Sequence, residues 1–237
     1  MYSSNFLSPE QQLVLSRNFS VLMRNVYTWM ALGLVMTAFT AMFVSSNESL
    51  LYTIVATPAL MWGLFIAEIA LVLILSARIN SMSFLTAGLM FAAYAILNGA
   101  TMSFVFLAYT AESIAQTFFI TAGTFGAMSL LGFFIKKDLS AMGRALYMLL
   151  IGLIIATVAN IFIASSGMAM VLNYAGVLIF VGLTAYDTQK IKHMLMAHSI
   201  GGVTEQSNKL ALLGSLILYL DFINLFLYIL RLFGNRK

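Results

Sequence analysis

The chain lacks cysteine altogether, which excludes disulfide bonds, thiol nucleophiles and zinc–thiolate sites. It is also poor in charge: 8% of its residues are charged, whereas soluble domains average about 25%. Proline occurs only twice, and there is no long polar linker. Neither HExxH nor GxSxG is present, so metallohydrolase and serine hydrolase functions have no basis in this sequence.

What the chain has instead is apolar sequence, since 62% of its 237 residues are hydrophobic. This composition is typical of a polytopic membrane protein whose main partner is the lipid bilayer. We expect one membrane domain over residues 1–237 and no soluble catalytic domain. The net charge of +4 does not indicate a nucleic-acid partner, because the basic residues are scattered through the short gaps between apolar runs.

The apolar runs predict an all-α integral membrane protein with seven transmembrane helices, each near the ~20 residues that a bilayer needs. The run between Arg78 and Lys136 contains one charged residue, Glu112, and is too long for a single span, so we expect a turn there. The predicted spans cover residues 26–45, 53–77, 83–108, 114–136, 144–165, 170–192 and 209–232.

The first residues do not resemble a cleavable signal peptide, because residues 1–25 hold three charged residues and no compact apolar core. Ser8, Pro9 and Gln11 are typical of a helix start, with Ser8 as the cap and Gln11 at the capping-box position. We therefore expect residues 1–25 to form an amphipathic lead-in to the first span.

The basic residues predict an orientation in the plasma (inner) membrane. Nine of the twelve fall on one side if the N-terminus is cytoplasmic, as the positive-inside rule favours. The other three, Arg231, Arg236 and Lys237, lie at the end of the sequence. Seven spans place them outside, against the rule. Two readings stay open: either a basic tail lies outside, or the last segment does not cross fully.

Asp221 is the most informative single residue, because it is the only charged residue between Lys209 and Arg231. A helix between these two residues is about 33 Å long, which is roughly one bilayer. A carboxylate at that depth costs on the order of 3 kcal/mol, so an acid placed there is a candidate functional residue.

A second acid, Asp187, lies near the end of the preceding span. At about 100° per residue, each of the last two spans presents one polar face with a glycine, which favours close packing of the two helices. We expect this packing to place Asp187 near Asp221. The supporting polar residues on these faces are Asn173 and Thr184 on span six, and Asn224 and Tyr228 on span seven.

Two carboxylates about 4 Å apart repel by about 4 kcal/mol at an effective dielectric constant near 20. The pair is therefore expected to share one proton and to respond to pH as a unit. When both acids are deprotonated, Asp187 and Asp221 also suit transient binding of Ca²⁺, which prefers carboxylate and carbonyl oxygens. A third intramembrane acid, Glu68, lies on span two, and Arg78 follows at the end of that span. We regard Glu68 and Arg78 as possible pore or latch residues.

Three segments resemble the signature segments of the Bax inhibitor-1 family, also called transmembrane Bax inhibitor motif proteins. They are Lys136-Lys-Asp-Leu-Ser140, Tyr186-Asp-Thr-Gln-Lys-Ile-Lys-His193 and Leu218-Tyr-Leu-Asp-Phe-Ile-Asn-Leu-Phe226. The resemblance implies a seven-helix fold in which the last helix is central and wrapped by the other six. It also implies a pH-sensitive calcium leak in which the two family aspartates match Asp187 and Asp221. Arg78 is then the candidate for a latch on Asp187.

Three functions follow as hypotheses. The first is a passive calcium (cation) leak channel gated by the shared proton, with Ca²⁺ as the permeant ion, no cofactor and no enzymatic activity. The second is a regulatory protein that binds and modulates a membrane-bound AAA protease, which the resemblance to some bacterial relatives suggests. The third is an intramembrane aspartyl protease, which uses two aspartates on successive helices. That chemistry requires Gly-x-Gly-Asp, whereas the sequence has Leu218-Tyr-Leu-Asp221.

Overall fold

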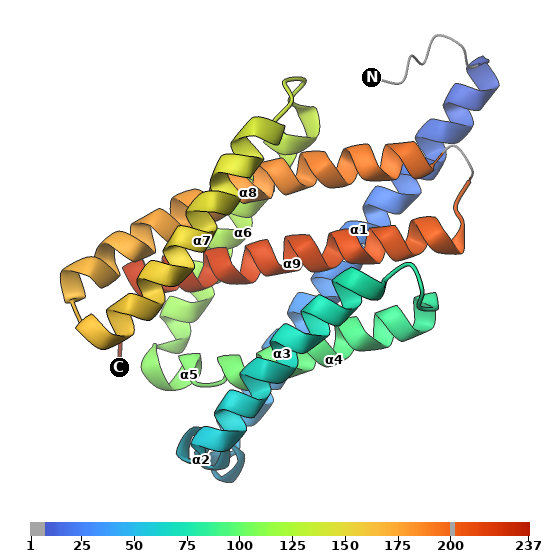
Figure 1. The fold of residues 1–237 in the computed structure, drawn as a ribbon. Helices are drawn as coiled ribbons and strands as arrows, with labels where there is room; N and C mark the ends of the chain where they lie inside the picture. The colour runs from blue at the N-terminus through green and yellow to red at the C-terminus, as the bar shows by residue number, and fades with distance from the viewer. Residues whose placement is uncertain (1–7, 200–201) are drawn as a thin grey trace. The chain divides into compact units, whose positions relative to one another are not determined.

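The computed structural model of the chain describes residues 8–199 and 202–237, and Figure 1 shows its helices in chain order from blue to red. The chain is an all-α integral membrane protein, as predicted. Seven candidate membrane spans are found in the described part, in α1, α3, α4 with α5, α6, α7, α8 and α9. The helices are α1 (Pro9–Ser46), α2 (Glu48–Ala56), α3 (Pro58–Arg78), α4 (Phe84–Met102), α5 (Val105–Ala108), α6 (Ala111–Phe134), α7 (Ser140–Ile163), α8 (Ser166–His198) and α9 (Glu205–Phe233).

Helix α1 begins where the sequence predicts. The Ser8 hydroxyl accepts a hydrogen bond from the Gln11 amide at 3.2 Å, and the Gln11 side chain accepts one from the Ser8 amide at 2.9 Å. This capping box satisfies two amides that no helical carbonyl reaches. The lead-in and the first span form one helix of 38 residues. Residues 1–7 of the predicted lead-in lie outside the described residues.

The second span begins later than predicted, at Pro58 instead of residue 53. Residues 53–56 belong to the short helix α2, which Asn47 caps by accepting a hydrogen bond from Leu50 at 3.1 Å. The break follows from Pro58. A proline disfavours helical geometry in the residue before it, and Thr57 is accordingly extended. Proline is well suited to the first position of the next helix.

The third span covers Phe84–Ala108, as predicted within one residue, but its helix is interrupted, because α4 ends at Met102 and the single turn α5 starts at Val105. Helix α8 runs on to His198, six residues past the predicted end of span six. The longer α8 gives Asp187 a position well inside a helix, which the predicted bounds did not.

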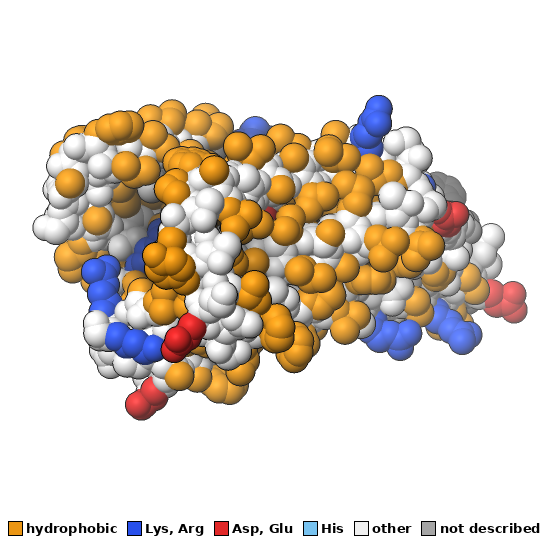
Figure 2. All heavy atoms as spheres, turned by 90° about the horizontal axis from the view of Figure 1, so that it is seen from below, with side chains coloured by type: hydrophobic (Ala, Val, Ile, Leu, Met, Phe, Trp, Pro, Cys, Tyr) orange, Lys and Arg blue, Asp and Glu red, His pale blue; other side chains and the backbone are white. Residues whose placement is uncertain are grey.

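Large hydrophobic side chains lie on the outside of the protein, as a lipid environment requires. Phe162 on α7 is 85% exposed, and Phe39, Phe119 and Ile161 are also largely exposed. The face in Figure 2 shows such side chains widely distributed, with the charged side chains in small groups. In lipid an exposed apolar side chain carries no hydrophobic penalty, so this surface is consistent with multi-pass membrane insertion.

The chain divides into two compact units. Unit 1 comprises Met1–Phe104 and Ile191–Leu216, and unit 2 comprises Val105–Lys190 and Ile217–Lys237. Helices α8 and α9 each contribute one part to each unit. Helix α9 is the most buried of the candidate spans: 72% of its most apolar stretch is buried, compared with 6% for α7. That the last helix is wrapped by the other six, and that the chain is one membrane domain, both stay predictions.

In unit 1, α4 packs closely on α1. A Cβ on Gly99 would lie 2.6 Å from the Thr37 carbonyl oxygen, so only glycine permits this approach. The Thr37 hydroxyl donates to the Ala95 carbonyl at 2.9 Å. The first two turns of α9 contact the connection between α3 and α4, where the Lys209 ammonium donates a hydrogen bond to the carbonyl of Met82 at 3.0 Å. Unit 1 is thus assembled by close backbone contacts and by a buried lysine.

Candidate functional site

The two predicted aspartates both lie in unit 2 and are both buried. Asp187 on α8 is 1% exposed and Asp221 on α9 is 5% exposed. Their charges interact, so the structure places them within electrostatic range of each other. The two acids therefore lie in the same unit and within range of each other's charge, and a direct contact between their carboxyl groups stays a prediction. Their role as a gating pair stays a prediction.

The packing of α8 on α9 explains how the acids meet. The Tyr228 ring lies directly over Gly176, where a Cβ would come within 2.5 Å of the ring. The same ring stacks on Phe180 with centroids 5.8 Å apart. These contacts join the first half of α8 to a residue near the end of α9. The two segments are therefore antiparallel, and Asp187 and Asp221 both lie further toward their connection.

Asp187 is held by a residue that the sequence analysis did not single out. The Tyr147 hydroxyl, on α7, donates to the two carboxylate oxygens of Asp187 at 3.1 and 3.2 Å. Tyr147 is one of ten tyrosines in the chain, and nothing in its surrounding apolar run distinguishes it. Only the packing of α7 against α8 reveals it as a partner.

A lysine ammonium lies beside the acids. Lys190 follows Asp187 by three residues on the same helix, and its Nζ lies 5.9 Å from the Tyr147 ring centroid and 6.0 Å from that of Tyr186. The two rings meet edge to face at 6.0 Å. Aromatic faces attract a cation, so they hold the ammonium where its charge interacts with both acids. One ammonium cannot neutralise two carboxylates, so full ionisation leaves an excess negative charge.

Asp221 differs from Asp187 in its hydrogen bonding. Its Oδ2 atom is buried and has no hydrogen-bond partner among the described residues. A buried carboxylate oxygen without a partner loses its water without compensation. Binding of a proton, a cation or a water molecule at this oxygen would therefore stabilise Asp221.

The segment of α8 around Asp187 is fixed by contacts with α6 and with the connection between α6 and α7. A Cβ on Gly132 of α6 would lie 2.8 Å from the Ala185 carbonyl carbon, so the two helices touch through backbone. Thr188 and Ser129 share a hydrogen bond of 3.1 Å. Gln189 is buried, accepts from the Leu139 amide at 2.9 Å and donates to the carbonyl of Lys137 at 2.9 Å. The backbone that carries Asp187 thus has little freedom to move.

The predicted supporting polar residues are placed differently from one another. Thr184 donates to the Phe180 carbonyl and Asn224 to the Leu220 carbonyl, each at 2.8 Å within its own helix. Asn173 is half-buried near the start of α8. Tyr228 is the predicted polar residue that makes the interhelical contact, through its ring. Their support of the acid pair stays a prediction.

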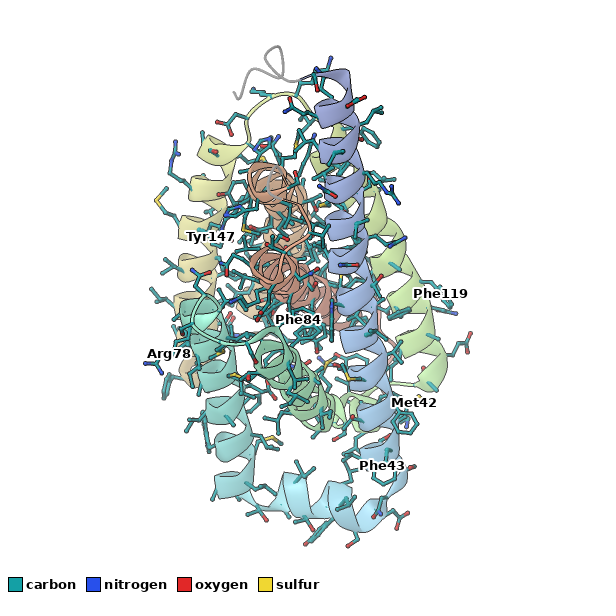
Figure 3. All side chains as sticks on the ribbon, turned by 90° about the vertical axis from the view of Figure 1, so that its right-hand side faces the viewer. Met42, Phe43, Arg78, Phe84, Phe119 and Tyr147 are labelled. Carbon is teal, nitrogen blue, oxygen red and sulfur yellow. The ribbon has the colours of Figure 1, made fainter. Side chains whose placement is uncertain are left out.

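Glu68 forms a separate polar group in unit 1. It is buried on α3 and accepts hydrogen bonds from Thr101 at 2.7 Å and from Asn98 at 3.3 Å, both on α4. Arg78 is exposed at the end of α3, and Figure 3 shows its side chain directed away from the helices. A latch from Arg78 to Asp187 would join the two units and stays a prediction, as does a pore role for Glu68.

Within residues 8–199 and 202–237, no group of three or more His, Cys, Asp or Glu side chains is arranged to hold a metal ion. A cation at the pair would meet two carboxylates and the Tyr147 hydroxyl. Because Ca²⁺ usually takes six to eight oxygen ligands, two carboxylates would bind it weakly.

Comparison with known proteins gives a consistent result over almost the whole chain. The family described as "Inhibitor of apoptosis-promoting Bax1" matches residues 19–237. The chain is 46% identical over 215 residues to inner membrane protein YbhL of Escherichia coli strain K12, covering 91% of this chain and 92% of that protein. It is 40% identical over 231 residues to a protein of Borreliella burgdorferi, covering 98% of both, and 41% identical over 215 residues to one of Deinococcus radiodurans, covering 91% of this chain and 90% of that protein.

Proposed function

Because the chain belongs to the Bax inhibitor-1 family of multi-pass membrane proteins, we propose that it is a passive, pH-sensitive calcium leak channel of the inner membrane. A proton shared between Asp187 and Asp221 gates it. The N-terminus faces the cytoplasm, as the distribution of basic residues favours. The protein has no cofactor and is not an enzyme in this proposal.

One observation carries the proposal: the buried Oδ2 of Asp221 has no hydrogen-bond partner in the described structure, and it lies within electrostatic range of the buried Asp187. Two buried acids beside one ammonium cannot both stay ionised without cost. A proton removes the excess charge, and so does a cation. The same site therefore suits competition between H⁺ and Ca²⁺.

Gating follows from the unequal anchoring of the two acids. Asp187 is held by Tyr147 and by a fixed segment of α8, whereas Asp221 depends on the charge state of the pair. Loss of the shared proton changes the repulsion between α8 and α9 and shifts the balance between two helix arrangements. Weak binding by few ligands suits an ion that must leave as well as enter.

The experiment is Ca²⁺ flux through purified protein in proteoliposomes across about pH 5 to 8, the range in which a shared proton is expected to exchange. Wild-type flux is expected to change by up to about tenfold per pH unit, the limit for one proton. Asp221→Asn is expected to remove the pH dependence, and Asp187→Asn to weaken or remove it.

The matched control is Glu112→Gln, which removes an exposed acid of α6 that contacts Gln116 instead of the pair. It is expected to behave as wild type. If both aspartate variants keep wild-type flux and pH dependence, the leak mechanism is wrong. A membrane AAA protease that then co-purifies with the protein in detergent would favour the regulatory function. Cleavage of a helical substrate would favour the protease.

A further inference from the structure

The last four residues of the chain, residues 234–237, form a tail that binds the connection between α5 and α6. The Thr110 amide donates to the Asn235 carbonyl at 3.2 Å, and the Lys237 amide donates to the Ala108 carbonyl at 3.1 Å. Between these bonds, Tyr109 and Arg236 form an isolated antiparallel bridge. All of these residues belong to unit 2. The end of α9 is thus attached by main-chain pairing to a segment more than a hundred residues earlier.

The tail satisfies backbone and side-chain groups at two helix ends. The last carbonyls of a helix generally lack partners within it, and here the Lys237 ammonium donates a hydrogen bond to the Phe106 carbonyl of α5 at 2.8 Å. A cation is favourable at a helix C-terminus. At the start of α6, the Ser113 hydroxyl accepts a hydrogen bond from the Asn235 amide at 2.9 Å. One short segment therefore caps both sides of the turn between the third and fourth spans.

Gly234 makes this attachment sterically possible. Its amide donates to the Leu230 carbonyl at 2.8 Å and so closes α9. A Cβ at this position would lie 2.7 Å from Cδ1 of Tyr109, closer than carbon atoms approach in proteins. The Tyr109 ring and the last turn of α9 thus fit together only where no side chain intervenes.

The attachment determines how α9 is placed in unit 2. Asp221 precedes Gly234 by 13 residues, or about 20 Å of helix. A slip of one residue at the end of α9 would turn Asp221 by about 100° and carry its carboxylate off the face that meets α8. Main-chain pairing resists such a slip, because its hydrogen bonds form in one register only.

We propose that residues 234–237 are a register clamp, which fixes the rotation and height of α9 so that Asp221 stays opposite Asp187. The clamp stays closed while the leak opens and closes. Its importance for ion flow rests on the proposed function, whereas its effect on α9 does not.

The first test deletes residues 234–237. In hydrogen–deuterium exchange, the Thr110 amide is expected to exchange about tenfold faster or more, as for an amide that has lost its structural partner. In the cysteine-free chain, the pair Phe180→Cys and Tyr228→Cys reports the register of α9 through its rate of cross-linking by a short thiol reagent. The deletion is expected to lower that rate about fivefold or more, and Ca²⁺ flux is expected to lose its pH dependence. Unchanged cross-linking would overturn the clamp, whether or not the protein conducts Ca²⁺.

The second test locks the clamp. Tyr109 and Arg236 are opposite each other in an antiparallel bridge and form no backbone hydrogen bonds with each other. Such pairs have the shorter of the two antiparallel Cα separations, which is compatible with a disulfide bond. Tyr109→Cys with Arg236→Cys is expected to oxidise readily and to show the same flux and pH profile before and after reduction. If oxidation stops the flux and reduction restores it, the tail must open and the clamp proposal is wrong.

Gly234→Val keeps the tail but crowds Tyr109. It replaces the deletion in the first test if the deletion variant does not fold, and it is expected to slow cross-linking between the cysteines introduced at positions 180 and 228 in the same way.

Discussion

At the scale of single residues, the two aspartates differ in hydrogen bonding although they belong to one site. Asp187 receives a phenol hydroxyl, and its helix is pinned on both sides of it. In Asp221, by contrast, one buried carboxylate oxygen has no hydrogen-bond partner in the described structure. The chemistry proposed for the pair comes from this inequality and not from the presence of two acids alone.

Tyr147 is the residue on which the position of Asp187 depends most directly. Tyr147→Phe removes the hydroxyl that binds both carboxylate oxygens. Hydrogen bonds to charged groups contribute about 1.5–3 kcal/mol, and Tyr147 is partly exposed, so we expect a loss of unfolding free energy of roughly 1 to 2 kcal/mol. The measurement is chemical or thermal unfolding in detergent.

The control is Tyr174→Phe on α8, which removes the hydroxyl of an exposed tyrosine in the same unit. It is expected to change stability by less than about 0.5 kcal/mol, as surface substitutions usually do. Equal effects of the two substitutions would show that the hydroxyl of Tyr147 does not support Asp187.

At the scale of elements, the contact between α6 and α8 is made by backbone and depends on one glycine. Gly132→Ala would place a methyl group 2.8 Å from the Ala185 carbonyl carbon and closer still to its oxygen. The helices must separate, so we expect a destabilisation of about 2 to 4 kcal/mol, in the range of overpacked cores. The readout is thermal unfolding of the purified protein.

Gly126 provides a matched control on the same helix, because a Cβ there meets nothing within 4 Å. Gly126→Ala replaces glycine by a better helix former and is expected to be neutral or stabilising by up to about 1 kcal/mol. If Gly132→Ala were tolerated equally well, the close packing of α6 on α8 described above would be incorrect.

At the scale of the whole molecule, the tail bears on the orientation of the last span. It pairs with residues 108–110 at the start of α6, whereas Lys137 lies just beyond the other end of that helix. The ends of α6 are about 35 Å apart, which is enough to cross a bilayer. Of the two readings that the sequence left open, this arrangement favours the basic tail on the side opposite to Lys137.

Cysteine labelling tests this orientation in cells. With a membrane-impermeant maleimide, Arg236→Cys is expected to be labelled from outside the inner membrane, and Lys137→Cys only after permeabilisation. The absence of native cysteine makes the background low. Labelling of both positions from the same side would contradict seven complete crossings and favour a last segment that does not span the membrane.

Much of the fold could be predicted because each signal was local. Apolar runs of about 20 residues identify spans, and Ser8 with Gln11 marks the start of α1 through a capping box formed within one turn. Local rules also explain where the predictions were wrong. Pro58 ends α2 and moves the second span, which a count of hydrophobic residues does not register.

The candidate site was predictable only in part, since charge in an apolar run is conspicuous and an uncharged partner is not. Asp187 and Asp221 stand out because burying a charge in a membrane is costly. The uncharged partners do not stand out in the sequence, because hydroxyl and amide groups occur throughout the chain; they are Tyr147, Ser129 and Gln189. Glu68 was recognised as an intramembrane acid, but its partners Asn98 and Thr101 on α4 were not.

The sequence by itself determined that this protein lies in a membrane, how many times it is expected to cross, and which acids must be compensated there. These properties depend on the solvation of each segment and can be read along the chain. The tertiary structure alone decided which groups supply the compensation: the Tyr147 hydroxyl at Asp187, no hydrogen-bond partner for Oδ2 of Asp221 among the described residues, and a tail that holds α9 at its end. Such pairings join residues 40 to 131 positions apart, and their formation depends on how helices pack against one another, which no local pattern records.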